Sequence, residues 1–391
     1  MRNDWVETSL GEIAEVIGGG TPSTAIAEYW DGNIVWLTPT EITSQDGEVI
    51  SDSIRKITNS GLKNSGAQML PVNSVILTSR ASVGFVALAG RDLCTNQGFQ
   101  SLIPKPSVLS KFLMFWIQQN RPEFESRSAG STFKEISKSN VKSIKLQLPP
   151  LPEQKRIVDL ISSVDSYIKA LQQQLESAKR SRNAVLHEFM NGEGTAFEQT
   201  QLGQIAKFLN GKAYSKEELL TVGKYRVLRV GNFFSNNNWY WSDLELEPNK
   251  YCENGDLLYA WSASFGPRMW NEEKVIYHYH IWKVNPDESQ VDKKWLLYWL
   301  EDDVERIKSS SGSGSIMMHV TKSEIEKRAI RLPTLTEQNR QLIILESFDQ
   351  NIHTLESLIG STNQLRSSML SDLLSGDHEI PASYDKVIGA A

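Results

Sequence analysis

Residues 148–156 read LPPLPEQKR, and residues 332–340 read LPTLTEQNR. The second stretch follows the first at an offset of 332 − 148 = 184 residues. The same offset holds without a gap for about forty residues, to Asn191-Gly192-Glu193 and Ser375-Gly376-Asp377, which indicates two copies of one structural unit. Duplicated modules related by approximate symmetry usually engage a target that has two parts.

The repeated segments have the periodicity of long helices. Apolar residues recur at alternating spacings of three and four, the period near 3.5 that is typical of a coiled-coil seam. The seam positions are Ile161, Val164, Ile168, Leu171, Leu175, Ala178, Val185 and Phe189 in the first copy, and Leu345, Phe348, Ile352, Leu355, Ile359, Thr362, Met369 and Leu373 in the second.

Proline and glycine mark the ends of these helices. Pro152 and Pro333 lie near the starts, where proline is tolerated, and Gly192 and Gly376 lie just past the ends, where glycine commonly stops a helix. Each helix would span roughly 38 residues, or about 57 Å. Two such helices most simply pair with each other, and antiparallel pairing would place the globular domains at opposite ends. The alternative is that each helix packs on its own domain; the largely apolar seams favour pairing.

Arg182 and Arg366 occupy matching slots in the two seams. One interpretation is that they set the register of the helices or meet a partner subunit. The other is that their stems pack on the seam while their charged heads reach water. The second interpretation is favoured here.

The segments before each helix are also related. Leu10-Gly11-Glu12-Ile13-Ala14 returns as Leu202-Gly203-Gln204-Ile205-Ala206, while the loops 43–57 and 232–241 differ. Short β-branched and aromatic runs indicate strands, and residues 111–118 and 294–300 indicate short helices. The expected fold class is α+β: two mixed α/β domains of about 140 residues, joined by two long helices in an antiparallel coiled coil, with a pseudo-two-fold internal repeat.

Composition limits the class of protein. The chain has 391 residues and a net charge of −6, which argues against an indiscriminate binder of polyanions but not against a local DNA-binding face. No run of about eighteen apolar residues occurs, so no membrane span is expected. The start, Met1-Arg2-Asn3-Asp4-Trp5, is polar and is not a signal peptide. Cys94 and Cys252 show no metal-ligand spacing, and a reduced, cytoplasmic setting is expected.

The order of domain, long helix, domain and long helix resembles the specificity subunit of type I restriction-modification systems. The motifs that carry the resemblance are residues 10–14, Thr95-Asn96-Gln97-Gly98-Phe99, residues 148–156 with their second copy, and the glycines at the helix ends. In the second domain Tyr277-His278-Tyr279-His280-Ile281-Trp282 departs from the motif at 96–99. On this resemblance, residues 1–147 and 194–331 are target recognition domains, residues 148–193 and 332–378 are helical spacers, and residues 379–391 form a tail.

The resemblance also implies partners and cofactors. Each domain would read one half of a bipartite sequence in double-stranded DNA, and two modification (methyltransferase) subunits and restriction subunits would dock on the chain. S-adenosylmethionine is expected on the modification subunits, and ATP and Mg on the restriction subunits. The chain itself has no Asn-Pro-Pro-Tyr-type methyltransferase motif and no phosphate-binding loop, so we expect neither a cofactor nor catalysis in it.

Polar and aromatic residues at matched loop positions are the candidate DNA contacts. Arginine can bind guanine bidentately, asparagine or glutamine can bind adenine, and hydroxyls suit phosphates or base edges. The candidates are Ser79, Arg80, Ser82, Asn96, Gln97, Ser131, Thr132 and Lys134 in the first domain, and Trp261, Ser262, Ser264, Arg268, His278, His280, Ser313 and Ser315 in the second. For each residue alone, a role in shaping a turn is an equal alternative. The recurrence of the set at equivalent places favours DNA contact.

Two other functions are compatible with parts of the sequence. A scaffold that holds two protein clients, without DNA, would fit the acidic net charge. A nuclease would need converging acids, and Asp256 followed by Glu272-Glu273-Lys274 loosely fits such a pattern. The first domain lacks this pattern, so these charges are interpreted as a surface turn.

Overall fold

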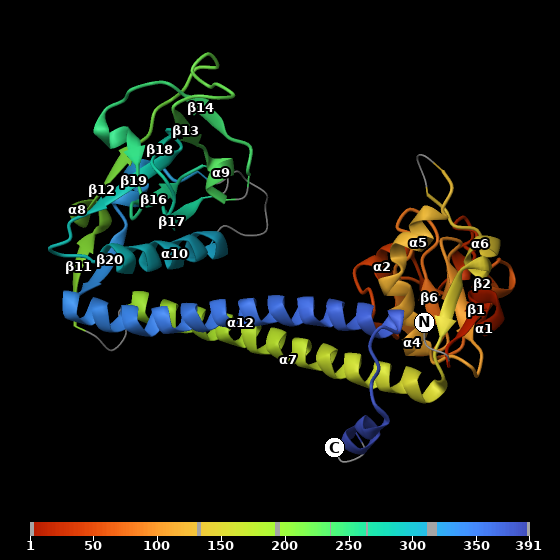
Figure 1. The fold of residues 1–391 in the computed structure, drawn as a ribbon. Coiled ribbons are helices and arrows are strands. Elements are labelled where there is room, and N and C mark those ends of the chain that lie inside the picture. The colour runs from red at the N-terminus through yellow and green to blue at the C-terminus, as the bar shows by residue number, and fades with distance from the viewer. Residues whose placement is uncertain are drawn as a thin grey trace. The chain divides into compact units, whose positions relative to one another are not determined.

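A computed structural model describes residues 4–130, 134–191, 196–234, 236–262, 265–310 and 319–388. The chain divides into two compact units, one made of Met1–Leu171 with Leu358–Ala391 and the other of Gln172–Ser357 (Figure 1). Each unit contains one globular domain and parts of both long helices, α7 (Leu151–Met190) and α12 (Leu335–Ser375).

The first unit is a mixed α/β domain. Besides parts of α7 and α12 it contains β1 (Val6–Ser9), α1 (Leu10–Ile13), β2 (Ala14–Gly18), η1 (Ala27–Tyr29), β3 (Trp30–Leu37), α2 (Pro39–Thr43), β4 (Val49–Ile50), β5 (Lys56–Ile57), α3 (Asn59–Lys63), β6 (Val75–Leu77), β7 (Val86–Ala89), β8 (Cys94–Thr95), β9 (Gln100–Pro104), α4 (Ser110–Gln119), α5 (Arg121–Ser126), α6 (Lys138–Ser143), β10 (Lys145–Leu148), η3 (Ala382–Tyr384) and α13 (Asp385–Ile388).

The second unit repeats most of this order. It contains β11 (Phe197–Gln201), α8 (Leu202–Ile205), β12 (Ala206–Asn210), β13 (Tyr225–Leu228), α9 (Val230–Phe234), β14 (Tyr240–Ser242), η2 (Pro248–Lys250), β15 (Tyr251–Cys252), β16 (Leu257–Ala260), β17 (Gly266–Met269), β18 (Val275–Tyr277), β19 (Ile281–Pro286), α10 (Lys293–Ser310), α11 (Lys322–Glu326) and β20 (Ala329–Pro333).

Sheet topology confirms the internal repeat. One sheet has the order β2-β9-β6-β7-β4 in the first unit and β12-β19-β16-β17 in the second. A second sheet, β5-β3-β8 or β14-β13-β18-β15, contains a parallel pair in each unit, β3 with β8 and β13 with β18. An antiparallel pair, β1 with β10 or β11 with β20, leads into each long helix. The expected α+β class and the two-fold repeat are therefore confirmed.

The repeated Leu-Gly-x-Ile-Ala motif joins the start of each domain to its end. Leu10 and Leu202 are buried, and their amides donate to the carbonyls of Ile144 and Arg328 at 2.9 Å. A Cβ at Gly11 would lie 3.0 Å from Cβ of Lys142, so glycine lets α1 and α6 approach each other without displacing Lys142. The motif is thus explained by packing.

The glutamine in the Leu-Pro-x-Leu-x-Glu-Gln motif fastens each long helix to its domain. Gln154 and Gln338 are both fully buried. The Gln338 side chain accepts from the Asp292 amide at 2.8 Å and donates to the carbonyls of Gln290 and Pro333. Gln154 makes the equivalent bonds to Leu109, Ser107 and Pro149 in the first unit. One amide side chain therefore satisfies three backbone groups at each helix start.

We expect the substitution Gln338→Leu to lower the free energy of unfolding of the second unit by about 2–3 kcal/mol. Leucine is similar in size but leaves the buried carbonyl of Pro333, and the part-buried amide of Asp292 and carbonyl of Gln290, without this partner. Urea unfolding followed by tryptophan fluorescence measures the loss. The control is Gln350→Leu at an exposed position of the same helix, where we expect a change within about 0.5 kcal/mol. Equal losses in the two variants would contradict this role of Gln338.

The two long helices lie side by side and antiparallel. In the first unit the start of α7 contacts the end of α12, and in the second unit the end of α7 contacts the start of α12 (Figure 1). The helices are 40 and 41 residues long, close to the expected length. Every seam position expected from the sequence is buried or half-buried. The predicted pairing is confirmed, and Gly376 follows α12 with φ +77°; Gly192 lies outside the described residues.

The favoured interpretation of the seam arginines is wrong. The Arg182 guanidinium pairs with Asp349 at 2.9 Å and with Glu301 at 2.8 Å, and only 15% of its side chain is exposed. Arg366 forms a bidentate pair with Asp165 in the first unit. These guanidinium groups are mostly covered and do not extend freely into water, because they pair with carboxylates on the facing helix and, in the second unit, on α10.

The predicted short helices differ in outcome. Residues 111–118 fall within α4, as expected. The helix expected at 294–300 continues to Ser310 as α10, because Val304 packs on the core and the buried Asp303 pairs with Arg328 at 3.0 Å. Among the residues described, no helix is long and apolar enough to cross a membrane.

Candidate nucleic-acid interface

In the first unit three backbone segments meet at the end of β6. We call this meeting point, made of Ser79, Gly98 and Ile136, the first junction. The Ser79 amide donates to the Gly98 carbonyl at 2.7 Å, and the Ile136 amide donates to the Ser79 carbonyl at 3.0 Å. The Asn96 side chain accepts from the Gly98 amide at 2.8 Å and so shapes the turn.

The second unit has the same arrangement with different side chains. Its second junction consists of Trp261, His280 and Val320. The Trp261 amide donates to the His280 carbonyl at 3.0 Å, and the Val320 amide donates to the Trp261 carbonyl at 3.2 Å. Nδ1 of His278 takes the place of the Asn96 oxygen, at 3.5 Å from the His280 amide. Residues 277–282 differ in sequence from the motif at residues 96–99, but they form the same turn. The side chains that the turn carries are imidazoles and a phenol rather than amides.

The first junction brings the described candidates of the first domain together. Arg80 and Ser82 lie on the turn after Ser79, where Ala81 has a φ of +59°. The Ala81 amide donates to the carbonyl of Lys134, whose side chain is exposed. Arg80 pairs with Glu135 at 2.9 Å and remains partly exposed. Ser79 itself is fully buried, and its hydroxyl has no partner among the described residues.

The last candidates of the first domain form the turn between β8 and β9. Gln97 is exposed, and its side chain accepts from the Thr21 hydroxyl. Asn96 is half-buried and bonded within its own turn. The exposed Gln97 can therefore meet a ligand through its amide nitrogen, whereas the half-buried Asn96 is held within its own turn.

The second junction brings together the aromatic candidates of the second domain. The Trp261 ring lies 4.8 Å from His280 and stacks on Trp282 at 5.8 Å. The centres of the His278 and His280 rings are 4.9 Å apart. Ser262 is buried beside them.

Arg268 serves a different purpose. Its guanidinium donates to the Phe233 carbonyl at 2.7 Å and so fixes the end of α9. Its second contact is with Glu272 at 3.5 Å. The remaining candidates, Ser131, Thr132, Ser264, Ser313 and Ser315, lie outside the described residues.

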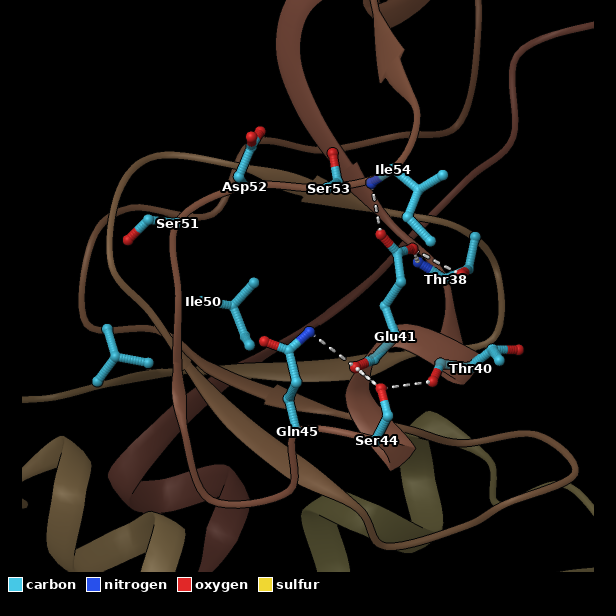
Figure 2. A pocket seen from close by; sticks show the side chains of 11 residues that line it. Thr38, Thr40, Glu41, Ser44, Gln45, Ile50, Ser51, Asp52, Ser53 and Ile54 are labelled. Atoms are coloured by element: carbon cyan, nitrogen blue, oxygen red, sulfur yellow. Dashed lines mark hydrogen bonds between the residues drawn. The ribbon is translucent and has the colours of Figure 1, made fainter. Parts of the chain in front are cut away.

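A cavity of about 510 Å³ follows β3 in the first unit (Figure 2). Its described lining is hydroxyl, carboxyl, amide and aliphatic, and none of it is aromatic: Thr38, Thr40, Glu41, Ser44, Gln45, Val49, Ile50, Ser51, Asp52, Ser53 and Ile54. The buried Glu41 carboxylate accepts from the amides of Thr38 at 2.9 Å and Ile54 at 2.8 Å. Glu41 is therefore occupied in holding α2 to the following loop.

A cavity of about 530 Å³ follows β13, the strand equivalent to β3, in the second unit. Its lining combines amide, aromatic and imidazole side chains with one arginine: Arg229, Val230, Gly231, Asn232, Asn236, Asn238, Trp239, Tyr240, His278 and His280. It therefore adjoins the second junction. Both cavities lie between a short helix, α2 or α9, and the loop that follows it, but only the second is also lined by residues of the turn before β19, and the two linings differ in chemistry.

The histidines of the second junction are uncharged at neutral pH. Burial, together with the neighbouring His280 and Arg229, lowers the pKa of His278 to about 4. Burial and His319 lower the pKa of His280. Each ring can therefore donate one hydrogen bond and accept one.

We expect acid to destabilise the second unit partly through His278. Its pKa is depressed on folding, so its contribution is present above about pH 6.5 and is lost as the pH falls toward 4. The loss should be about 1–2 kcal/mol, since the ring is only half-buried. Urea unfolding at several pH values measures it. In His278→Gln the stability should depend less on pH in this window; an unchanged slope would contradict the assignment.

The nuclease-like charges do not converge. Asp256 pairs with Lys283 at 2.6 Å, Glu273 pairs with Arg226, and Lys274 pairs with Glu253 at 2.7 Å. Within the described ranges, no group of His, Cys, Asp and Glu is placed to hold a metal ion. Both cysteines are free and buried, and burial raises the pKa of Cys94 to about 12.

Sequence reasoning located the variable loops but not the cavities that they form. Asn232, Asn236 and Tyr240 fall in the loop whose divergence the sequence showed, yet none was singled out. The run of asparagines beside aromatic residues at 236–241 was the available signal.

Comparisons with known proteins agree with this geometry. The family model of the type I restriction modification DNA specificity domain matches residues 2–180 and 195–364. The chain is 38% identical over 178 residues to the type I restriction enzyme MjaIX specificity subunit of Methanocaldococcus jannaschii, over 45% of this chain and 41% of that protein. It is 20% identical over 408 residues to the MjaVIII specificity subunit of the same organism. That match covers 96% of this chain and 93% of that protein.

The fold also matches a solved structure. A chain from a study of the assembly and conformational transition of the type I R-M system superimposes with a TM-score of 0.68 at 18% identity, over 97% of this chain and 99% of that chain. The family model covers both repeats and most of the sequence. The chain belongs to the family of type I restriction modification DNA specificity domains.

Proposed function

We propose that this chain reads both halves of a bipartite double-stranded DNA target within a type I restriction-modification complex. The observation that carries the proposal is the pair of junctions, which share one backbone arrangement but display different side chains. A common frame with different polar and aromatic groups suits two domains that perform the same task on different base sequences.

The proposal assigns a role to each part of the chain. Residues 1–147 and 194–331 are the target recognition domains, residues 148–193 and 332–378 set the spacer between half-sites, and residues 379–391 are a tail. Two modification subunits dock on the helices, and restriction subunits join the larger assembly. Methyl transfer with S-adenosylmethionine, and ATP- and Mg-dependent cleavage, belong to those subunits, so this chain is non-catalytic.

The candidates that are exposed or half-buried, other than those already bonded within a turn or to a neighbouring helix, are the proposed DNA contacts. In the first domain these are Arg80, Ser82, Gln97 and Lys134, and in the second Trp261, His278 and His280, with Ser131, Thr132, Ser264, Ser313 and Ser315 as further candidates. The buried or bonded candidates, Ser79, Asn96, Ser262 and Arg268, are proposed to position the contacts.

Selection of bound duplexes from a random DNA pool tests the proposal with the full chain bound to its modification subunits. We expect one enriched motif with two different half-sites. Gln97→Ala should relax one half-site only and His280→Ala the other, by about 1–3 kcal/mol of discrimination at the affected base pair. The control Gln119→Ala, at an exposed end of α4, should leave the motif unchanged. Recovery of no motif would overturn the proposal and favour the two-client protein scaffold.

A further inference from the structure

The cavity after β13 is concave, whereas a surface that reads the major groove must protrude into it. At about 530 Å³ it lies in the size range of ligand pockets, roughly 300–1,000 Å³. A groove edge cannot fill such a hollow. Of the parts of a DNA duplex, a base rotated out of the stack can project far enough to enter it.

The walls of this cavity offer flat surfaces for stacking. The Arg229 guanidinium lies 5.0 Å from the centre of the Tyr240 ring, and Tyr240 is 40% exposed. Trp239 and the imidazole of His280 complete the planar groups. Aromatic and guanidinium planes are the surfaces on which proteins stack unpaired bases.

The amides of the cavity have unused hydrogen-bonding atoms of both kinds. The Asn232 amide nitrogen donates to the carbonyls of Asn236 and Asn238, at 2.8 and 2.9 Å, while its oxygen has no partner among the described residues. The side-chain oxygen of Asn236 accepts from the backbone amide of Asn238 at 2.7 Å. The side-chain nitrogen of Asn236 has no partner among the described residues. One acceptor and one donor complement an amino donor beside a ring-nitrogen acceptor, a pattern that adenine and cytosine share, and at about 530 Å³ the cavity has room for the larger base, the purine adenine.

The charge of the lining favours a neutral ligand over a phosphate. Arg229 is the sole cationic side chain among the described lining residues, and its guanidinium lies against Tyr240. The two histidines are neutral at physiological pH because burial disfavours their charged forms. A phosphate site would gather several cations or backbone amides.

We propose that this cavity receives one unstacked adenine-class base from the half-site that the second unit reads. The proposal rests on the proposed function, because it assumes DNA on this face. The cavity after β3 in the first unit has no aromatic lining among its described residues, so base capture is assigned to the second unit alone. The two half-sites would then be read by different physical means.

The test uses the full chain with its modification subunits and duplexes that carry the selected motif. The base opposite each position of the second half-site is removed, one position at a time. We expect binding to tighten on the order of tenfold at one adenine position, because the cost of unpairing is already met. A 2-aminopurine at that position should become brighter on binding.

Variants of the cavity decide the outcome. Tyr240→Ala and Asn236→Ala, both at exposed positions, should abolish the tightening while the chain stays folded, as thermal melting will show. The matched control is Ser51→Ala in the first cavity, which should retain it. Selective binding with no position that tightens would overturn the base pocket alone. Weaker binding to every sequence, with a shallower salt dependence, would identify a phosphate site and also overturn it. Loss of all sequence selectivity in the unsubstituted chain would instead refute the proposed function.

Discussion

Lengthening both long helices by one heptad is expected to lengthen the DNA spacer between the two half-sites by about three base pairs. Seven helical residues add about 10.5 Å, and base pairs are spaced by about 3.4 Å. Insertions between Leu171 and Gln172 and between Ser357 and Leu358 fall at the boundaries of the two units and leave the contacts within each unit intact.

A whole heptad is required in each helix. The seam alternates spacings of three and four, so seven residues restore the same face to the partner helix. Methylation mapping of DNA modified by the variant complex measures the spacer. A heptad in α7 alone is the control and should disrupt pairing, with loss of modification. An unchanged spacer in the double insertion would show that the helices do not set the distance.

Replacing Arg182 with methionine is expected to lower the free energy of unfolding of the second unit by about 3 kcal/mol. Methionine keeps the apolar stem but leaves Glu301 and Asp349 without their cation. Burial already raises the pKa of Glu301, so a charged carboxylate there is costly without Arg182. Tryptophan fluorescence in urea measures the change, with Arg180→Met at an exposed position as the control.

The equivalent pair in the first unit gives a second comparison. Adding the offset of 184 to Asp165 and Arg182 gives Asp349 and Arg366, so the two ion pairs are copies of each other. Arg366→Met should cost less, because it leaves one carboxylate rather than two. The exchange Asp165→Arg with Arg366→Asp should recover stability relative to either single change. Equal losses for Arg180→Met and Arg182→Met would show that the seam pair contributes nothing.

The sequence predicted the long helices and their pairing because both rest on a simple periodicity. Seam positions such as Ile161 and Leu345 recur at regular spacing and are fully buried. The repeated motifs were visible, but their purpose was not. Gln154 bonds backbone groups at residues 107–109 and 149, and local sequence does not specify such distant partners.

The site was harder to predict, for a physical reason. The sequence gives the type of a residue but not whether its side chain faces solvent. Ser82 is partly exposed, whereas Ser79, three residues earlier, is fully buried. The positions of the Arg182 and Arg366 guanidinium groups are set by ion pairs with Asp349 and Asp165, which lie outside the apolar seam pattern. Cavities form where loops of different sequence meet, so Asn232 and Tyr240 became visible as a pair only in the folded domain.

Single-molecule methylation sequencing of DNA modified by the complex that contains this chain would show directly what the two repeated domains recognise. We expect one bipartite motif with two unlike half-sites and a fixed spacer. Exchange of residues 194–331 for those of a relative should change one half-site and leave the other intact. A continuous motif, or modification without any motif, would contradict the claim that the two repeated domains each read half of one DNA target.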